Sequence, residues 1–307
     1  MPPALPSVVA LFGPTASGKT AVARALATRI PGEIVSADSA SLYRGLPILT
    51  AAPPAGTRLA GVFDLSEEVS VGAFAHLAHA AIDEIVAAGR TALVAGGTGL
   101  YLRAALAELA LPPAPGPGER ERWARLYDRV GGPAAHGVLA ERDPAAAARV
   151  HANDRRRVVR ALELAAAGSS LAPARDALWS DETRLPTLII GLDVPSAELD
   201  RRIELRTRAM FDAGVVDEVR AAAARPLSAT ARKIMGLELI AELGGDAYEP
   251  LVQATKRFAR YQRKWMRRLP GLVSVRADQS ADEVADAILA LGRPGQRVPA
   301  HRAGAER

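Results

Sequence analysis

Short apolar runs alternate with amphipathic stretches along most of the chain. The apolar runs predict strands at Val8 to Phe12, Glu33 to Ser36, Thr91 to Ala95, Thr187 to Val194 and Leu272 to Val275. The amphipathic stretches predict helices at Lys19 to Arg29, Val71 to Ala88, Ser196 to Ala213, Pro250 to Leu269 and Asp282 to Leu291. Strands that are separated by helices usually pair in parallel, so the pattern predicts an α/β fold with a parallel sheet.

The alternation is interrupted in the middle of the chain. Leu111 to Gly118 (LPPAPGPG) holds four prolines and two glycines, and cannot continue a helix or a central strand. From Glu119 to about Ala167 the pattern is helical and rich in alanine and arginine. We therefore expect a core formed by residues 1–112 and 179–292, an all-helical insertion at 113–178, and a disordered tail at 293–307.

Composition narrows the class of protein. Hydrophobic residues make up 49% of the 307 residues, which is enough for a large core, and cysteine is absent, which excludes disulfides and thiolate zinc sites. The first apolar run is too short for a signal sequence, and no run is long enough to span a membrane. A cytoplasmic protein without a membrane partner is expected. The net charge is +5, and Lys256 to Arg268 holds seven basic residues and no acid, which suggests a polyanionic partner.

A phosphate-binding motif follows the first predicted strand. Gly13 to Thr20 reads GPTASGKT, which matches GxxxxGK[ST] between a strand and a helix. Glycines let successive backbone N–H groups turn inward, and the start of the helix adds a positive dipole. Lys19 supplies a positive charge for the phosphates, and Thr20 a hydroxyl suited to Mg²⁺. The expected phosphate ligands of this P-loop are Gly13, Pro14, Thr15, Ala16, Ser17, Gly18, Lys19 and Thr20.

The P-loop does not say which diphosphate or triphosphate binds. Asp38 follows the second predicted strand and is the nearest candidate for a metal or substrate ligand, although a turn or helix-capping role is equally compatible with its position. The third strand ends in Gly96 to Tyr101 (GGTGLY), which also suits an ordinary strand-to-helix crossing.

Together these segments resemble the tRNA dimethylallyltransferase (tRNA isopentenyltransferase) family. The family's GPTASGKT, its ADS-x-x-hydrophobic-Tyr-Arg-Gly segment and its GGTGLY occur here in order. Further matches follow at His151 to Asp154, at Arg160 to Glu163, in the helix that carries Arg202, Ile203, Arg206, Met210, Gly214, Glu218 and Val219, and at Phe258 to Gln262 with Trp265. The resemblance runs from about residue 8 to 268. It implies a P-loop NTPase-like core with an inserted all-helical domain.

Five places depart from the family pattern. Ser41 and Arg156 replace glutamines, a lysine expected near Ala52 is missing, and paired histidines are replaced around Gly61. The family's late IGY-x-E element survives only as Met235, Gly236 and Leu237 with Glu238 one place early. These departures fall mostly on residues that the resemblance would place against tRNA.

The resemblance implies transfer of a dimethylallyl group from its diphosphate to the exocyclic amine of an adenine beside the tRNA anticodon. The P-loop, Lys19 and Mg²⁺ would neutralise the leaving diphosphate. Asp38 would accept the proton of the amine as general base, and Thr98 would hydrogen-bond near the base. Arg202 and Arg206, one helical turn apart, are candidates for the diphosphate, or alternatively a solvated face paired with Glu198 and Glu204.

An adenine inside the anticodon loop must leave the stack to reach such a pocket. Lys256, Arg260, Arg263 and Arg267 share one face of a predicted helix, opposite Phe258, Trp265 and Leu269, and that face suits tRNA phosphates or a solvated surface. Arg155, Arg156, Arg157 and Arg160 form a second cluster on the insertion. The full set expected to contact the tRNA anticodon stem-loop is Asp38, Ser39, Ala40, Ser41, Thr98, Arg120, Arg156, Arg157, Arg160, Arg260, Arg263 and Arg267.

Three other functions stay open at this point. An ATP-dependent small-molecule or nucleotide kinase explains the P-loop equally well but leaves the insertion and the arginine clusters without a role. A nucleotide-binding RNA chaperone, and prenyl transfer to free adenine nucleotides, are the others. A monomer is expected, and the exact prenyl donor is not specified by the sequence.

Overall fold

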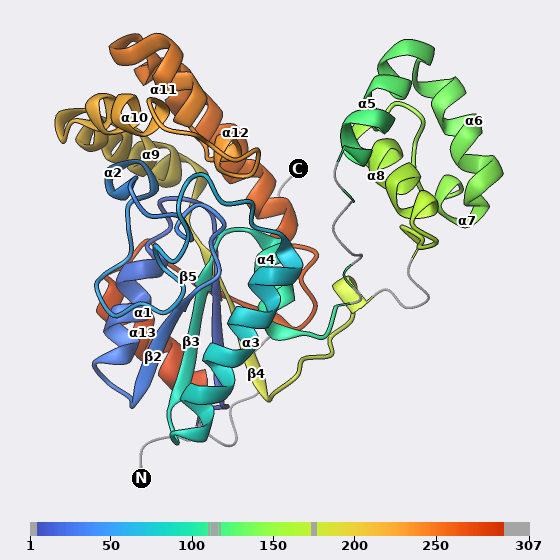
Figure 1. Cartoon of the computed structure of the whole chain (residues 1–307). Helices are drawn as coiled ribbons and strands as arrows, with labels where there is room; N and C mark the ends of the chain where they lie inside the picture. Colours follow the sequence, from blue (N-terminus) through green and yellow to red (C-terminus); the bar gives the residue numbers. More distant parts are fainter. Residues whose placement is uncertain (1–4, 110, 112–115, 117, 173–176, 292–307) are drawn as a thin grey trace. The chain divides into compact units, whose positions relative to one another are not determined.

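The computed structural model describes residues 5–109, 111, 116, 118–172 and 177–291 (Figure 1). The chain divides into two compact units, one formed by Met1–Glu108 with Leu178–Arg307 and the other by Leu109–Ala177. The second unit overlaps the segment predicted as an insertion at 113–178. The predicted tail at 293–307 lies outside the described residues.

The first unit is built on a five-stranded sheet in which every neighbouring pair is parallel, so the predicted α/β fold is confirmed. Its spatial order is β2-β3-β1-β4-β5. β1 lies in the centre and is buried along its whole length, as expected for an apolar run covered on both faces. The strands are β1 (Val8–Phe12), β2 (Gly32–Ser36), β3 (Thr91–Gly96), β4 (Thr187–Asp193) and β5 (Leu272–Arg276).

Helices cover both faces of the sheet (Figure 1). Val9 and Leu11 of β1 pack into one buried cluster with residues of α1 (Lys19–Ala27) and α13 (Ala281–Leu291). The opposite face is covered by α3 (Val71–Ala87) and α4 (Gly99–Leu106). The alternation of side chains along β1 therefore serves two separate layers.

A further group of helices lies beyond the carboxyl ends of the strands (Figure 1). The predicted helix from Ser196 to Ala213 is α9 (Ser196–Asp212), and the one from Pro250 to Leu269 is α12 (Tyr248–Met266). α9 ends before Gly214, whose φ of +89° reverses the chain into a separate helix. The remaining helical segments were not predicted: α2 (Pro47–Thr50), α10 (Val215–Ala223), α11 (Leu237–Leu243) and the 3₁₀ turns η1 (Ala177–Trp179), η2 (Ala231–Lys233) and η3 (Gly244–Ala247).

α2 shows why such short helices escape prediction from sequence. It has only four residues, and the backbone N–H groups of its first turn donate hydrogen bonds to a residue far along the chain. The Glu218 carboxylate of α10 accepts hydrogen bonds from the N–H groups of Ile48 (2.7 Å) and Leu49 (2.8 Å). Because the capping residue comes from a distant part of the chain, no local sequence pattern predicts this helix.

The second unit has its own small core. Trp123, Leu139, Val158 and Leu162 are buried together, and the carboxylate of Glu163 is buried beside them. The helices of this unit are α5 (Glu119–Val130), α6 (Gly132–Arg142), α7 (Pro144–Ala147) and α8 (Arg155–Ala166).

Within the first unit, the two segments that flank this insertion are tied together. The Arg184 N–H donates to the Leu106 carbonyl at 2.8 Å, and the Arg184 side chain forms ion pairs with Asp83 (2.7 Å) and Glu108 (2.9 Å). Arg103 of α4 is fully buried and donates to the carbonyls of Leu178 (3.0 Å) and Glu182 (3.2 Å). Among the described residues, no helix is both long and apolar enough to cross a lipid bilayer.

Candidate active site at the carboxyl ends of the strands

The P-loop connects β1 to α1 at the centre of the sheet. Gly18 has a φ of +89° and directly precedes the helix, and Ala16 is held at a φ of +63°, which is uncommon for a residue with a side chain. The Lys19 ammonium donates to the carbonyls of Gly13 (2.9 Å) and Pro14 (2.8 Å) and so closes the loop on itself. The backbone is therefore curled as a phosphate cradle requires.

Two features of this loop fit a bound diphosphate and cation. The Ser17 hydroxyl is buried and has no hydrogen-bond partner within the described part of the chain, which is an unusual state for a buried polar group. Thr20, in the first turn of α1, is exposed to solvent. In the described residues, no three His, Asp or Glu side chains are placed to hold a metal. A Mg²⁺ ion would therefore depend on the Thr20 hydroxyl and on oxygens of the ligand.

Lys19 is electrostatically connected to two other candidate residues. Burial lowers the pKa of its ammonium group to about 8, an effect that the nearby Asp38 opposes and the nearby Arg206 reinforces. Burial also lowers the pKa of Arg206, again opposed by Asp38, but an arginine stays protonated. Lys19, Asp38 and Arg206 thus form one charge cluster.

Asp38 follows β2 and enters this cluster from a tight turn. One carboxylate oxygen, Oδ1, accepts from the Ala40 N–H at 3.0 Å, and so Asp38 does have the turn role that its position allowed. The turn is supported by Ser41, whose hydroxyl donates to the Asp38 carbonyl at 3.1 Å and lies 2.6 Å from the buried Ser36 hydroxyl. The local contacts hold the carboxyl group and leave its second oxygen without a local partner among the described residues.

The GGTG turn after β3 lies beside the Asp38 turn. The Ala37 N–H donates to the Ala95 carbonyl at 2.8 Å, and the hydroxyls of Ser39 and Thr98 are 3.4 Å apart. Thr98 precedes α4, but its side chain does not cap that helix. The structure therefore places Thr98 beside Ser39, the residue that follows Asp38.

The two arginines predicted for the diphosphate are in different surroundings. Arg206 belongs to the charge cluster of Lys19 and Asp38. Arg202 instead pairs with Glu198 at 2.6 Å and donates to the Ala277 carbonyl at 3.0 Å. In this structure Arg202 therefore has the helix-face ion pair that was its alternative, and the role of both arginines toward a diphosphate stays a prediction.

One residue contacts the P-loop although the sequence assigned it no role. Gln262 of α12 is 2% exposed and bonds both to the Thr15 N–H and to the Gly97 carbonyl. Two sequence signals could have found it: Gln262 lies in the family-matching segment Phe258 to Gln262, and it is a glutamine at a helix position whose other buried neighbours, such as Val252 and Ala259, are apolar.

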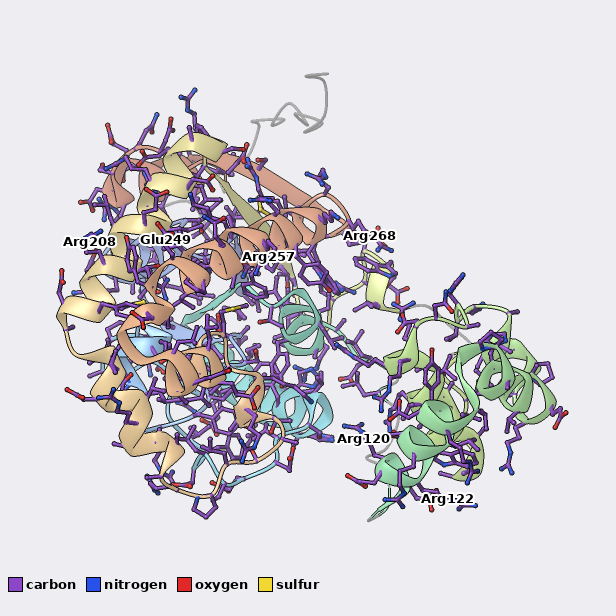
Figure 2. All side chains as sticks on the ribbon, turned by 90° about the horizontal axis from the view of Figure 1, so that it is seen from above. Arg120, Arg122, Arg208, Glu249, Arg257 and Arg268 are labelled. Carbon is purple, nitrogen blue, oxygen red and sulfur yellow. The ribbon has the colours of Figure 1, made fainter. Side chains whose placement is uncertain are left out.

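Two of the four basic residues predicted to form a cationic face on α12 are already engaged in ion pairs. Lys256 pairs with Glu204 at 2.6 Å, and Arg263 pairs with Asp193 and donates to the Val194 carbonyl, both at 3.1 Å. The sequence prediction missed this because the acids lie on other elements. Arg260 and Arg267 are exposed and make no ion pair within the described residues; Figure 2 shows Arg257 on the same helix and Arg268 just beyond its end.

The arginines of the second unit divide in the same way. Arg120 (3.0 Å) and Arg160 (2.9 Å) both pair with the buried carboxylate of Glu163, so these two predicted tRNA contacts take part in the unit's own structure. Arg156 and Arg157 are exposed on α8, and Arg157 forms a surface ion pair with Asp154 at 3.7 Å. These two remain the stronger candidates for a nucleic-acid contact here.

Three of the departures from the family pattern lie around one cavity. Ser41, Ala52 and Gly61 line a half-open hollow of about 320 Å³, next to the turn that carries Asp38. Each is smaller than the residue that the family pattern leads one to expect at or near its position.

The fold and the site together define a P-loop protein with a phosphate cradle and a carboxylate beside it. The model of the IPP transferase family matches residues 41–269. The tRNA dimethylallyltransferase of Anaeromyxobacter dehalogenans is 43% identical over 303 residues, covering 94% of this chain and 99% of the relative.

Solved structures agree with this family. A tRNA isopentenylpyrophosphate transferase from Bacillus halodurans has a TM-score of 0.66 and 30% identity, with 93% of this chain and 95% of that chain covered. A eukaryotic dimethylallyltransferase acting on tRNA, 21% identical, has the same fold with a TM-score of 0.73, covering 94% of this chain and 81% of that one. This chain belongs to the IPP transferase family, and it is a prenyltransferase.

Proposed function

We propose that this protein transfers the dimethylallyl group of dimethylallyl diphosphate to the exocyclic amine of an adenine beside the anticodon of tRNA, and releases diphosphate. The observation that carries the proposal is the cluster of Lys19, Asp38 and Arg206, in which a phosphate-binding cation lies within electrostatic reach of a carboxylate. Two relatives that are 43% and 46% identical to most of this chain are named tRNA dimethylallyltransferase.

The P-loop holds the donor through its diphosphate. The Lys19 ammonium, now donating to the Gly13 and Pro14 carbonyls, turns to the phosphate oxygens when the donor binds. Arg206 adds a second cation, a guanidinium group that stays charged. These cations stabilise the negative charge that grows on the leaving oxygen as the allylic C–O bond breaks.

Asp38 acts on the adenine that receives the prenyl group. The exocyclic amine of adenine is a poor nucleophile because its lone pair is delocalised into the ring. As its nitrogen bonds to the allylic carbon, the Asp38 carboxylate takes the proton that the nitrogen must lose, while the C–O electron pair leaves with the diphosphate. Thr98 and Ser39, 3.4 Å apart, offer hydroxyls for orienting the base.

Mg²⁺ is the cofactor that suits this site. Thr20 and the donor's own phosphate oxygens would hold it. When bound, the ion neutralises part of the diphosphate charge and improves the leaving group.

Exposed arginines suit the tRNA backbone. Arg260 and Arg267 on α12 and Arg156 and Arg157 on α8 are solvent-exposed cations. The target base must be extruded from the anticodon loop, whose single-stranded character lowers the cost. Phosphate contacts on these arginines would position the loop without reading its sequence.

A P-loop kinase is not favoured, because the relatives carry prenyltransferase names. One experiment separates the two functions. The protein is incubated with Mg²⁺, bulk tRNA and either labelled dimethylallyl diphosphate or γ-labelled ATP. Prenyl label in tRNA supports the proposal, whereas label transferred only from ATP would establish a kinase.

The affinity for the donor should depend on pH through Lys19. Its folded-state pKa of about 8 lies below the ordinary 10.5, so the charged form is complete well below pH 8 and is lost as the pH rises above it. Phosphate oxygens have finished titrating by then, since their second pKa is about 6. We expect the dissociation constant for dimethylallyl diphosphate, measured by calorimetry, to rise by about tenfold per pH unit above 8.

The matched control for that prediction is Lys19→Arg, which stays charged throughout the range. Its donor affinity should be flat between pH 7 and 10. A wild-type profile equally flat to pH 10 would mean that Lys19 does not provide the charge that binds the donor.

tRNA affinity should fall steeply with salt, and Arg260 and Arg267 should account for part of the slope. Each phosphate contact releases condensed counterions, so the Arg260→Ala/Arg267→Ala variant should flatten the log–log slope by roughly 1.4–1.8, at about 0.7–0.9 per contact. The slope is measured by filter binding of bulk tRNA across a salt series.

The control removes the same charge elsewhere. Arg220 and Arg276 are exposed and pair with their neighbours Asp217 and Asp278. Arg220→Ala/Arg276→Ala should leave the slope nearly unchanged. If both double variants flattened it equally, net charge and not contact by α12 would explain the salt dependence.

A further inference from the structure

Gln262 joins two loops. In the proposed function one of them holds the prenyl donor, and the other lies beside the adenine. The Oε1 atom of Gln262 accepts a hydrogen bond from the Thr15 N–H of the P-loop at 2.8 Å, and its Nε2 donates to the Gly97 carbonyl of the GGTG turn at 2.9 Å. The N–H can only donate and the carbonyl can only accept, so the amide has one orientation. Gln262 is thus a two-ended bridge between the P-loop and the turn that carries Thr98.

The GGTG turn is shaped around this bridge. A Cβ atom on Gly97 would overlap the Gln262 amide nitrogen and would come within 3.2 Å of the Gly13 carbonyl. A Cβ atom on Gly99 would overlap the indole of Trp265, one turn further along α12. The two glycines therefore let α12 approach the turn closely, which gives GGTG a reason beyond an ordinary strand-to-helix crossing.

The backbone that carries Gln262 is itself held firmly. The next residue, Arg263, pairs with Asp193 and donates to the Val194 carbonyl, both at 3.1 Å, at the end of β4. Trp265 packs against Trp179 with ring centroids 4.8 Å apart. α12 is therefore held in place by contacts other than those to the two loops, so the Gln262 amide can fix the positions of the loops.

Packing alone does not require a buried amide, because burying a polar group costs free energy. Gln262 is 2% exposed, and burying its polar group is tolerated only because both ends are satisfied. An apolar side chain of similar length would fill the space equally well. The hydrogen-bonded form is informative because its two partners lie on the two loops whose separation matters for chemistry.

We propose that Gln262 is a positioning residue that fixes the P-loop against the GGTG turn, and thereby sets the distance between the donor's allylic carbon and the adenine amine. The inference rests on the proposed function, in which the P-loop holds the diphosphate and Thr98 lies beside the base. In this proposal Gln262 acts through the two loops that it bonds, and not on either substrate directly. Since a displacement of about 1 Å can lower a rate by about 10²-fold, loss of the bridge acts on turnover more than on binding.

The first test is Gln262→Met, which keeps the length of the side chain and removes both hydrogen bonds. We expect kcat, measured with saturating tRNA and dimethylallyl diphosphate, to fall by roughly 10²-fold, with far smaller changes in either dissociation constant. Hydrogen exchange of the Thr15 amide should accelerate, while the Ser17 amide, bonded to the Pro14 carbonyl at 3.2 Å, should not change. The matched control is Gln253→Met on an exposed position of the same helix, which should behave as wild type.

The second test is Gln262→Glu, which supplies a readout that a merely structural role would not move. Ionised, the carboxylate can accept from Thr15 but repels the Gly97 carbonyl; protonated, it can donate to that carbonyl and restore both bonds. The ratio of variant to wild-type kcat should therefore rise as the pH is lowered. This test stands even if Gln262→Met fails to fold.

The outcomes are separable. Wild-type kcat in Gln262→Met, or a Gln262→Glu ratio that does not vary with pH, would overturn the positioning role, even if the melting temperature fell. Absence of prenyl transfer by the wild-type protein would refute the proposed function instead. In that case unchanged Thr15 exchange in Gln262→Met would still overturn the bridge.

Discussion

Lys19→Ala should lower turnover by at least about 10³-fold and weaken binding of dimethylallyl diphosphate. Lys19 is the P-loop cation, and its ammonium group now satisfies two loop carbonyls at 2.8 and 2.9 Å. A charged hydrogen bond contributes about 1.5–3 kcal/mol, so we expect donor affinity to fall by roughly 10- to 100-fold. Single-turnover transfer to tRNA and calorimetric titration of the donor measure the two effects.

The control is Lys233→Ala, which removes an exposed lysine from η2 and should leave donor affinity at the wild-type value. If Lys19→Ala bound the donor as tightly as wild type, the phosphate cradle would have to be elsewhere in the molecule.

The second large effect is expected for Asp38→Asn. The asparagine Oδ1 can still accept from the Ala40 N–H, so the turn should survive, but the proton acceptor is lost. We expect transfer to tRNA to slow by roughly 10²–10⁴-fold with donor binding retained. Removing the Asp38 charge also lowers the pKa of Lys19 further, so the comparison belongs below pH 7, where Lys19 stays protonated.

Turnover of Asp38→Asn close to that of the wild type would leave Asp38 only its role in the turn. Thermal unfolding of the variant checks the premise, since a preserved Ala40 contact predicts little change in melting temperature.

The strands and long helices could be predicted because their signals are local. Each strand is a short apolar run, and the predicted and observed limits of the strands differ by a residue at most. The P-loop, Asp38 and Thr98 come together because the carboxyl ends of parallel strands meet at one edge of the sheet. The sequence shows that each of them follows a strand, whereas the roles of Asp38 and Thr98 came from the family resemblance.

Pairings between distant elements could not be predicted. Lys256 and Arg263 were assigned to a cationic face, but their partners Glu204 and Asp193 lie on α9 and β4. The pairing of Arg202 with Glu198 on the same helix was one of the alternatives that the sequence offered, whereas only the structure shows that Arg206 lies near Asp38. Gln262 was missed for the same reason, since its partners follow β1 and β3.

The tie between Arg184 and Leu106 has a consequence for how this molecule came to be assembled. The hydrogen bond at 2.8 Å, with the ion pairs to Asp83 and Glu108, closes the sheet-bearing unit across the point where the insertion leaves and returns. The inserted helices in turn enclose a core of their own around Trp123 and Leu162. Such a junction lets the inserted helices be lengthened, exchanged or lost over evolution without disturbing the sheet-bearing unit.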